Sequence, residues 1–332
     1  MIRVRGLFAA LMVAAIGMAG IAQTASAAGP PLPVAKNGNP VKVFASGVAI
    51  PTQIAFKGKV AFISGGAEGK VKGGLYYVKP GSTKPKRVPG TPRVAFGVTW
   101  HHGHLYVNVG TRILVLRGWT GSRFKHSRTL VGFKRSKFTS FSGLEFGPNG
   151  RLYTGVGVQF DAKAGNRAYA NSVISIDKRS GKIRTVSTGL RQPWMLTFVK
   201  GIRSPYFSVL GQDTPKGTKA PDLIVKATQG ANFGFPRCNW YNVKVCRKLH
   251  FTKPLLTFAA ADPSPSPMGI TAKGHKLFVA MFGNQSIMVT NTAGAKPKDF
   301  VTGFVAPALL AHYHAGYLYM GDLTGQVYRV KA

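Results

Sequence analysis

The chain has 332 residues and carries 45 Lys and Arg against only 9 Asp and Glu, a formal net charge of +36. A field of this strength favours anionic surfaces such as those of a cell envelope. Because the basic residues are scattered along the chain and no nucleic-acid-binding motif accompanies them, we expect no nucleic-acid partner.

Residues 1–27 have the organisation of a secretory signal peptide. Two arginines precede an apolar run over residues 7–22, and Ala25-Ser26-Ala27 has the small-x-small pattern of a signal-peptidase site. The apolar run is shorter than the roughly 20 residues of a transmembrane helix, so a membrane anchor is the disfavoured alternative. We expect cleavage near Ala27 and a secreted or periplasmic, envelope-associated protein that does not span the membrane.

Residues 28–39 are predicted to be a linker and residues 40–332 a single all-β domain. Short apolar or alternating runs lie between many glycines and prolines, and long helical periodicity is missing. One unit recurs six times: an apolar strand, a glycine-containing turn, a second strand with an aromatic residue, and a glycine or aspartate. The second strands begin at Val60, Leu105, Leu152, Tyr206, Leu277 and Leu318. This spacing is typical of four-stranded blades and predicts a six-bladed β-propeller.

The ends of the domain indicate how the ring closes. "RTVSTGLRQP" and "DFVTGFVAP" read as outermost strands that lead into the next unit, and "KVFASGVAIP" looks the same but precedes the first unit. The chain also stops one strand short after "GQVYRVKA". We therefore expect residues 42–48 to complete the last blade and leave no free sheet edge. Two separate β domains are the alternative.

The scarce acidic residues are predicted to gather on one face of the propeller. Loops that follow second strands share a face with the corners that enter first strands, and most of the acids fall in these connections. A cation or a polyhydroxyl ligand would be held at such positions. The predicted metal ligands are Glu68, Asp161 and Asp213, and the predicted substrate or channel residues are Trp194, Asp213, Asp262 and Asp322.

The histidines and cysteines favour structural roles. "HHGH" (101–104) and "HYH" (312–314) are interpreted as residues of turns on the opposite face, in preference to a metal site. Cys238 and Cys246 have seven residues between them, and in an exported protein they are expected to form one local disulfide. Two thiolates alone do not make a closed tetrahedral metal site.

Four segments resemble a known family. "GLRQPWMLTF" (189–198), "GQD" (211–213) and "GANFGFPRC" (230–238) are similar to segments of the glucose/sorbosone dehydrogenase-like quinoproteins, and "LEFGPNGRLYTGVG" (144–157) resembles a hairpin of that family. The resemblance implies a six-bladed propeller that oxidises an aldose or another alcohol with pyrroloquinoline quinone (PQQ) held by Ca²⁺. It also implies that the quinone accepts a hydride while a histidine takes the hydroxyl proton. The cofactor-binding residues that it implies are Arg191, Gln192 and Asn284.

The chain departs from the family at the general base. Thr139 and Ser140 stand where the resemblance leads us to expect a histidine, and neither hydroxyl is a base near neutral pH unaided. Asp161 is the predicted substitute base. Three hypotheses follow: a monomeric quinoprotein-like dehydrogenase of a small sugar or alcohol with a rebuilt site, a non-catalytic propeller that binds carbohydrate or an envelope polymer, and a metal-dependent lactonase-type hydrolase.

Overall fold

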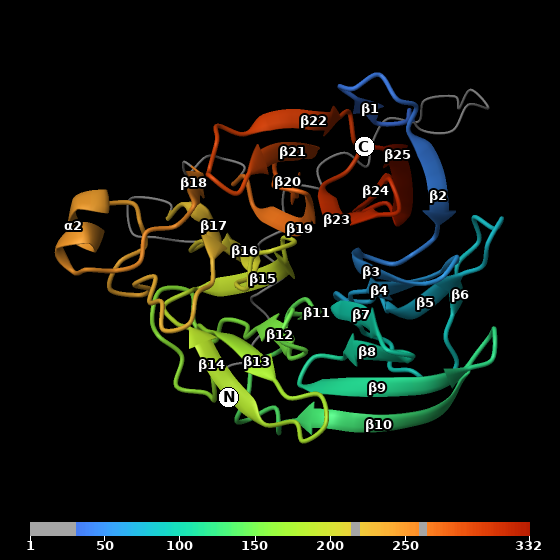
Figure 1. The fold of residues 1–332 in the computed structure, drawn as a ribbon, viewed down its shortest axis with the longest axis horizontal. Helices are drawn as coiled ribbons and strands as arrows, with labels where there is room; N and C mark the ends of the chain where they lie inside the picture. Colours follow the sequence, from blue (N-terminus) through green and yellow to red (C-terminus); the bar gives the residue numbers. More distant parts are fainter. Residues whose placement is uncertain (1–30, 214–219, 259–263) are drawn as a thin grey trace.

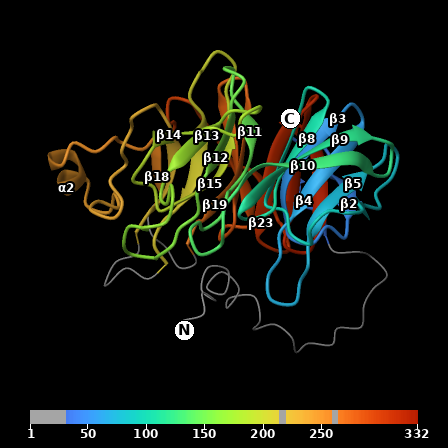
Figure 2. The same ribbon diagram turned by 90° about the horizontal axis from the view of Figure 1, so that it is seen from below.

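The computed structural model describes residues 31–213, 220–258 and 264–332, so the predicted signal peptide lies outside the described residues. Six antiparallel sheets stand around a central axis, like the blades of a propeller (Figure 1), and Figure 2 shows the ring from its side. The predicted all-β, six-bladed propeller is confirmed.

The blades follow one another in chain order. Blade I has β3 (Pro51–Lys57), β4 (Val60–Gly65), β5 (Gly74–Val78) and β6 (Lys86–Arg87). Blade II has β7 (Gly97–His101), β8 (His104–Asn108), β9 (Arg112–Trp119) and β10 (Phe124–Gly132). Blade III has β11 (Glu145–Phe146), β12 (Leu152–Gly155), β13 (Val173–Ile176) and β14 (Ile183–Ser187). Blade IV has β15 (Gln192–Thr197), β16 (Tyr206–Leu210), β17 (Asp222–Lys226) and β18 (Leu256–Phe258).

The last two blades each include a strand from the N-terminal part of the described chain. Blade V has β19 (Pro267–Lys273), β20 (Lys276–Met281), β21 (Ser286–Asn291), β22 (Lys298–Thr302) and, at its edge, β1 (Val34–Ala35). Blade VI has β23 (Ala308–His314), β24 (Tyr317–Asp322), β25 (Gln326–Lys331) and, outermost, β2 (Lys42–Ser46).

The ring closes as the sequence predicts. Strand β2 pairs antiparallel with β25, from Lys42 opposite Arg329 to Ser46 opposite Gln326, and Figure 1 shows the two side by side. Strand β1, in the segment predicted as a linker, pairs with the outer edge of β22, where the Lys36 N–H donates to the Phe300 carbonyl at 2.8 Å. Two otherwise open sheet edges are thereby covered.

Side chains between blades hold the ring together. Phe62 of blade I stacks on Trp100 of blade II with ring centroids 5.8 Å apart, and Trp119 meets Phe62 edge-on at 4.9 Å. Trp100 and Trp119 are therefore partly buried and pack against the core between blades I and II. A polar link is added by Gln53 of β3: its Nε2 donates to the Leu144 carbonyl at 2.9 Å, and its Oε1 accepts the N–H groups of Val98 and Leu144, each at 3.0 Å. One side chain thus joins blades I, II and III.

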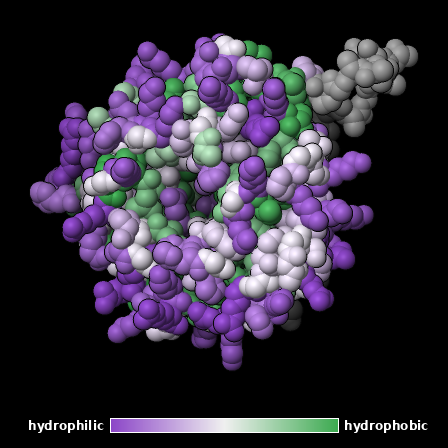
Figure 3. Space-filling view, turned by 45° about the vertical axis from the view of Figure 1, so that its right-hand side comes forward, coloured by the Kyte–Doolittle hydropathy of each residue, from purple (hydrophilic) through white to green (hydrophobic). Residues whose placement is uncertain are grey.

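Blade IV carries the only α-helix of the described residues. Helix α2 (Val243–Lys248) begins at Asn242, whose side chain accepts the Val245 N–H at 3.2 Å, and it projects from the ring in Figure 1. Cys246 of this helix is joined to Cys238, which confirms the predicted local disulfide. No helix in the described part of the chain is long and apolar enough to cross a membrane. The surface in Figure 3 is mainly hydrophilic, as the charge predicts.

Candidate functional site

The arrangement of the strands gives the propeller two distinct faces. Connections from second to third strands and from one blade to the next lie on one face, which we call the Arg191 face. Turns from first to second and from third to fourth strands lie on the other, the hairpin face. Arg191 stands in the corner between β14 and β15, immediately before β15 begins.

Local packing fixes the backbone of this corner. Gly189 has a φ of +70°, and a Cβ there would lie 2.2 Å from Oδ1 of Asn232, so only glycine fits. Thr188 forms a parallel bridge with Asn232, and Phe233 donates its N–H to the Thr188 carbonyl at 3.0 Å. The segment 230–238 therefore holds the corner that presents Arg191, which explains why the two segments form one motif in the sequence.

Arg191 binds two aspartates that come from different loops. Its Nη2 lies 2.6 Å from Oδ1 of Asp161, in the β12–β13 connection, and 2.6 Å from Oδ2 of Asp213, which follows β16. Its Nε also donates to the Asp161 carbonyl at 3.3 Å, and Oδ1 of Asp161 accepts the Asp213 N–H at 2.9 Å. Arg191 is buried at 5% exposure, whereas the side chains of Asp161 and Asp213 are 30% and 39% exposed. The guanidinium thus lies beneath two carboxylates that face solvent.

The charges in this cluster oppose one another. Burial raises the pKa of Asp213, the Arg191 guanidinium lowers it, and the carboxylates of Asp161 and Asp222 raise it again. With both aspartates ionised, the three side chains carry one net negative charge. In a protein with nine acidic residues, two of them are thus concentrated at one point.

Gln192 supports the loop that carries Asp161. It is buried at 3% exposure, and its Oε1 accepts the Val158 N–H at 2.6 Å. Asn171 holds the same loop from the other side, because its side chain donates to the Arg191 carbonyl at 3.0 Å and accepts the Gly165 N–H at 2.8 Å. Gln192, predicted to bind a cofactor, therefore contacts the protein's own backbone.

The other predicted site residues lie apart from this cluster or have their own contacts. Asp322 is fully buried and accepts hydrogen bonds from Thr324 and from the Tyr328 hydroxyl. Trp194 is 7% exposed and meets Phe96 edge-on at 6.3 Å. Glu68 pairs through its backbone with Val71, and Asn284 is exposed between β20 and β21. Asp262 lies outside the described residues.

The predicted metal site has only two of its three ligands together. Arg191 already binds Asp161 and Asp213, and the described residues contain no group of three or more His, Cys, Asp or Glu side chains that could hold a metal ion. Glu68 is the third predicted ligand, and burial raises the pKa of its carboxyl. A calcium ion takes six to eight oxygen ligands, many more than this pair of carboxylates provides.

The positions of the expected general base are occupied by packing residues. Thr139 donates its hydroxyl to the Gly157 carbonyl at 2.7 Å, and a Cβ added at Gly157 would lie 2.6 Å from the Ser140 hydroxyl. The Thr139 hydroxyl is thus bonded to the backbone, and the Ser140 hydroxyl lies against Gly157. Ser264 donates its hydroxyl to Oδ2 of Asp222 at 2.7 Å.

A second set of titratable groups lines the central channel near the hairpin face. A cavity of about 230 Å³ is bounded by the first strands, with Glu145 of β11 and His312 of β23 on its wall. Burial raises the pKa of Glu145 to about 8, against a lowering by the Phe198 N–H. Burial, followed by His314, lowers the pKa of His312 to about 4. The side chains of Glu145 and His312 are therefore both mainly uncharged at pH 7. The interpretation of His312 as a turn residue is wrong, because β23 continues to residue 314 and points this ring into the channel.

Comparison with known proteins gives matches in structure alone. No family model and no curated protein matches the sequence. The PQQ-bound form of an aldose sugar dehydrogenase from Streptomyces coelicolor is 18% identical, with a TM-score of 0.70 over 90% of this chain and 99% of that chain. The apo-form of a soluble aldose sugar dehydrogenase from Escherichia coli is 16% identical, with a TM-score of 0.68 over 88% and 99%. This chain has the sugar dehydrogenase fold.

A third match broadens that comparison. The calcium structure of a Trichoderma reesei carbohydrate-active enzyme of family AA12 is 14% identical, with a TM-score of 0.69 over 91% of this chain and 98% of that chain. Identities this low establish a shared architecture and leave the chemistry of the site to the residues that this chain contains. The resemblance inferred from the segments 189–198 and 230–238 is confirmed at the level of the fold.

The residues of the Arg191 face do not fit PQQ and Ca²⁺ in the manner that the resemblance implies. Nη2 of Arg191 is bonded to both aspartates, the net charge of the cluster opposes a ligand with carboxylates of its own, and packing residues replace the base. We therefore derive no step through the quinone.

Proposed function

We propose that this protein binds a sugar or another polyhydroxyl compound on the Arg191 face, with Asp161 and Asp213 as the hydroxyl acceptors. The observation that carries the proposal is the buried Arg191 guanidinium, which holds two partly exposed carboxylates together from separate loops. The two oxygens of an ionised carboxylate together provide about four acceptor positions, and adjacent hydroxyls of a sugar are matched donors.

Charge favours a neutral ligand over an anionic one at this point. The cluster carries one net negative charge when both aspartates are ionised, so it would repel an acid and accept hydrogen bonds from a neutral polyol. Hydrogen bonds to charged acceptors are about twice as strong as those between neutral groups. Because Arg191 fixes both carboxylates before binding, little side-chain entropy is lost when the ligand arrives.

The test is calorimetric titration with a panel of aldoses and polyols. Asp161→Asn and Asp213→Asn should each weaken binding by about tenfold, because each removes a charged acceptor. Asp177→Asn is the matched control, since Asp177 is a partly exposed aspartate of the β13–β14 turn, on the hairpin face, and lies 3.8 Å from Arg151. Equal effects of all three substitutions, or no binding by the unmodified protein, would refute the proposal.

Oxidation of the bound compound is the second candidate function. It is favoured by the fold shared with a PQQ-bound aldose sugar dehydrogenase over 90% of this chain, together with the place of Arg191 at the corner before β15. Asp161, the predicted base, has a partly exposed carboxylate in the β12–β13 connection, 2.6 Å from Nη2 of Arg191.

Titration of the purified protein with PQQ, in the presence and absence of Ca²⁺, tests this candidate through the absorbance of the quinone. An aldose panel with an artificial electron acceptor follows. Turnover that requires PQQ and is lost in Asp161→Asn would establish the dehydrogenase, whereas sugar binding without quinone binding would leave a non-catalytic binding propeller. The lactonase hypothesis gains no support from the described residues, which show no cluster of metal ligands.

We also propose that the protein is exported and held at an anionic envelope by its charge. The N-terminal sequence of the protein recovered from cells should begin at Ala28 if the predicted cleavage occurs. Retention of residues 1–27 in the recovered protein would contradict this proposal.

A further inference from the structure

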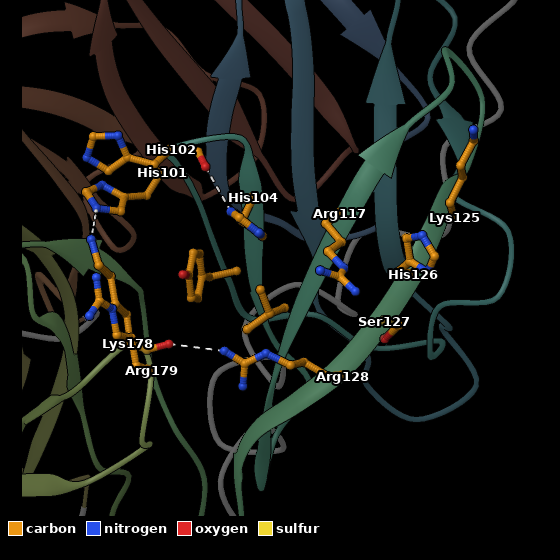
Figure 4. A pocket seen from close by; sticks show the side chains of 12 residues that line it. His101, His102, His104, Arg117, Lys125, His126, Ser127, Arg128, Lys178 and Arg179 are labelled. Atoms are coloured by element: carbon orange, nitrogen blue, oxygen red, sulfur yellow. Dashed lines mark hydrogen bonds between the residues drawn. The ribbon is translucent and has the colours of Figure 1, made fainter.

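A groove with a strongly basic wall lies on the hairpin face, between blades II and III. Its cavity volume is about 630 Å³, and its walls come from the β7–β8 turn, β9, β10 and the β13–β14 turn. Figure 4 shows Lys178 and Arg179 on one side and Arg117, Lys125 and Arg128 on the other. We call these five residues and the space between them the interblade groove. Permanent positive charges from two blades therefore face the same space.

Among the described residues, no carboxylate forms an ion pair with these charges, and none lines the interblade groove. Asp177 directly precedes Lys178, but it accepts the N–H groups of Arg179 and Ser180 and lies 3.8 Å from Arg151. Like charges that converge without compensation raise the energy of the empty groove, and an anion would relieve this repulsion.

Neutral groups hold the two sides of the interblade groove in place. Arg128 donates through Nη2 to the Lys178 carbonyl at 3.1 Å and so bridges the two blades. Nζ of Lys178 lies 3.2 Å from Nε2 of His101, and the His101 ring stacks on Phe146 at 3.7 Å. Burial, followed by the neighbouring His102, Lys178 and His104, lowers the pKa of His101 to about 4, so the neutral ring accepts a hydrogen bond from the Lys178 ammonium. The groove is therefore organised before any ligand binds.

We propose that the interblade groove binds a multivalent phosphate. Planar guanidinium groups match phosphate oxygens in pairs, and Arg117, Arg128 and Arg179 present three of them around one cavity. A cavity of about 630 Å³ is in the range that holds whole small molecules, so a single phosphate ion would leave most of it and most of its charge uncompensated. The ligand therefore presents several phosphate groups close together, on a free oligophosphate, on an envelope polymer or on a lipid surface.

Calorimetric titration with tripolyphosphate tests this proposal. The measurement is made in about 0.15 M salt, where charges more than roughly 8 Å apart are screened and the scattered surface charge contributes little. Arg117→Gln with Arg179→Gln removes one guanidinium from each side, and both side chains are exposed without a side-chain hydrogen bond among the described residues. Lys84→Gln with Lys86→Gln is the charge-matched control, on blade I.

We expect tripolyphosphate to bind at least tenfold more tightly than inorganic phosphate or citrate. The groove variant should bind it at least tenfold more weakly, and the control variant should change the affinity by less than twofold. Thermal unfolding of both variants shows that the fold is kept. Equal losses in the two variants would mean that binding follows the total charge and would overturn the site, and citrate binding as tightly as tripolyphosphate would overturn the preference for phosphate.

Two further probes identify the source of the phosphate groups. Poly(glycerol phosphate) that competes with tripolyphosphate supports a polymer-borne ligand, and vesicles of phosphatidylglycerol that compete support a lipid surface. Competition by neither supports a free oligophosphate. A single-stranded DNA oligonucleotide that binds tenfold more tightly than tripolyphosphate, with the same dependence on Arg117 and Arg179, would identify a nucleic-acid site and overturn the proposal.

Discussion

Substitution of Arg191 by Gln should destabilise the protein in a manner that depends on pH. The change removes the guanidinium that holds Asp161 and Asp213 and leaves two carboxylates beside each other without their counter-ion. Gln keeps the length and polarity of the side chain, so the corner before β15 should retain its shape. The loss should therefore report the electrostatics of the cluster.

The contacts of Arg191 set the size of the effect. Two charge-assisted hydrogen bonds of 2.6 Å are lost, and each such bond contributes about 1.5–3 kcal/mol when the partners are buried. The aspartate side chains are 30% and 39% exposed, so water screens part of this energy. We expect the free energy of unfolding at pH 7 to fall by about 2–4 kcal/mol.

The pH dependence follows from the sign of the pKa shift at Asp213. Burial raises this pKa, so the protonated carboxyl favours the folded state, and its contribution is lost as the pH rises above the unfolded value. Arg191 counteracts the shift, and its removal raises the pKa further. The difference in stability between variant and unmodified protein should therefore be small near pH 4 and reach its full size by pH 7.

Urea denaturation of both proteins at several pH values measures this difference. A second variant, Asp213→Asn in the Arg191→Gln background, should recover part of the stability at pH 7, because it removes one of the two uncompensated charges. A loss that is the same at pH 4 and pH 7, with no recovery in the double variant, would show that Arg191 acts through packing and would refute the electrostatic reasoning.

Three further perturbations test other parts of the structure. Replacement of both Cys238 and Cys246 by Ser should lower the free energy of unfolding by about 2.5 kcal/mol, the entropy of a closed loop of this length, measured by urea denaturation with and without reductant. Gln53→Leu leaves buried backbone groups of Val98 and Leu144 without their partner and should cost about 2–4 kcal/mol by the same assay. Glu145→Gln should gain about 3–4 kcal/mol relative to the unmodified protein between pH 5 and pH 8, because the raised pKa makes ionisation of Glu145 increasingly costly as the pH rises. A constant difference across that range would contradict this.

The sequence was most informative where a pattern repeats. Strand, turn and aromatic strand recur six times, and each predicted second strand begins within one residue of its position in the structure, as at Val60 and Leu152. The pairing of β2 with β25 could be predicted because a ring with one missing strand and one extra strand has a single closure. The edge strand β1 could not, since two residues without periodicity carry no signal.

The site was less predictable because its contacts join distant parts of the chain. Arg191 stands out in the sequence as part of a motif, but its partners lie 30 and 22 residues away in loops with no regular pattern. Blade geometry placed Asp161 and Asp213 on the same face, yet it gave no distance between their side chains. The prediction of His312 as a turn residue is wrong because β23 extends through residues whose sequence resembles a turn.

The two faces of the propeller concentrate opposite charges, and this separation argues against a single nonspecific role for the net charge of +36. On the Arg191 face, two of nine acids meet around one buried cation, whereas five cations on the hairpin face converge on the interblade groove without an acid. Scattered charges would give neither arrangement a preference for one ligand. A protein held at an anionic surface by the basic groove would keep the acidic cluster turned away from that surface, where a neutral sugar can reach it.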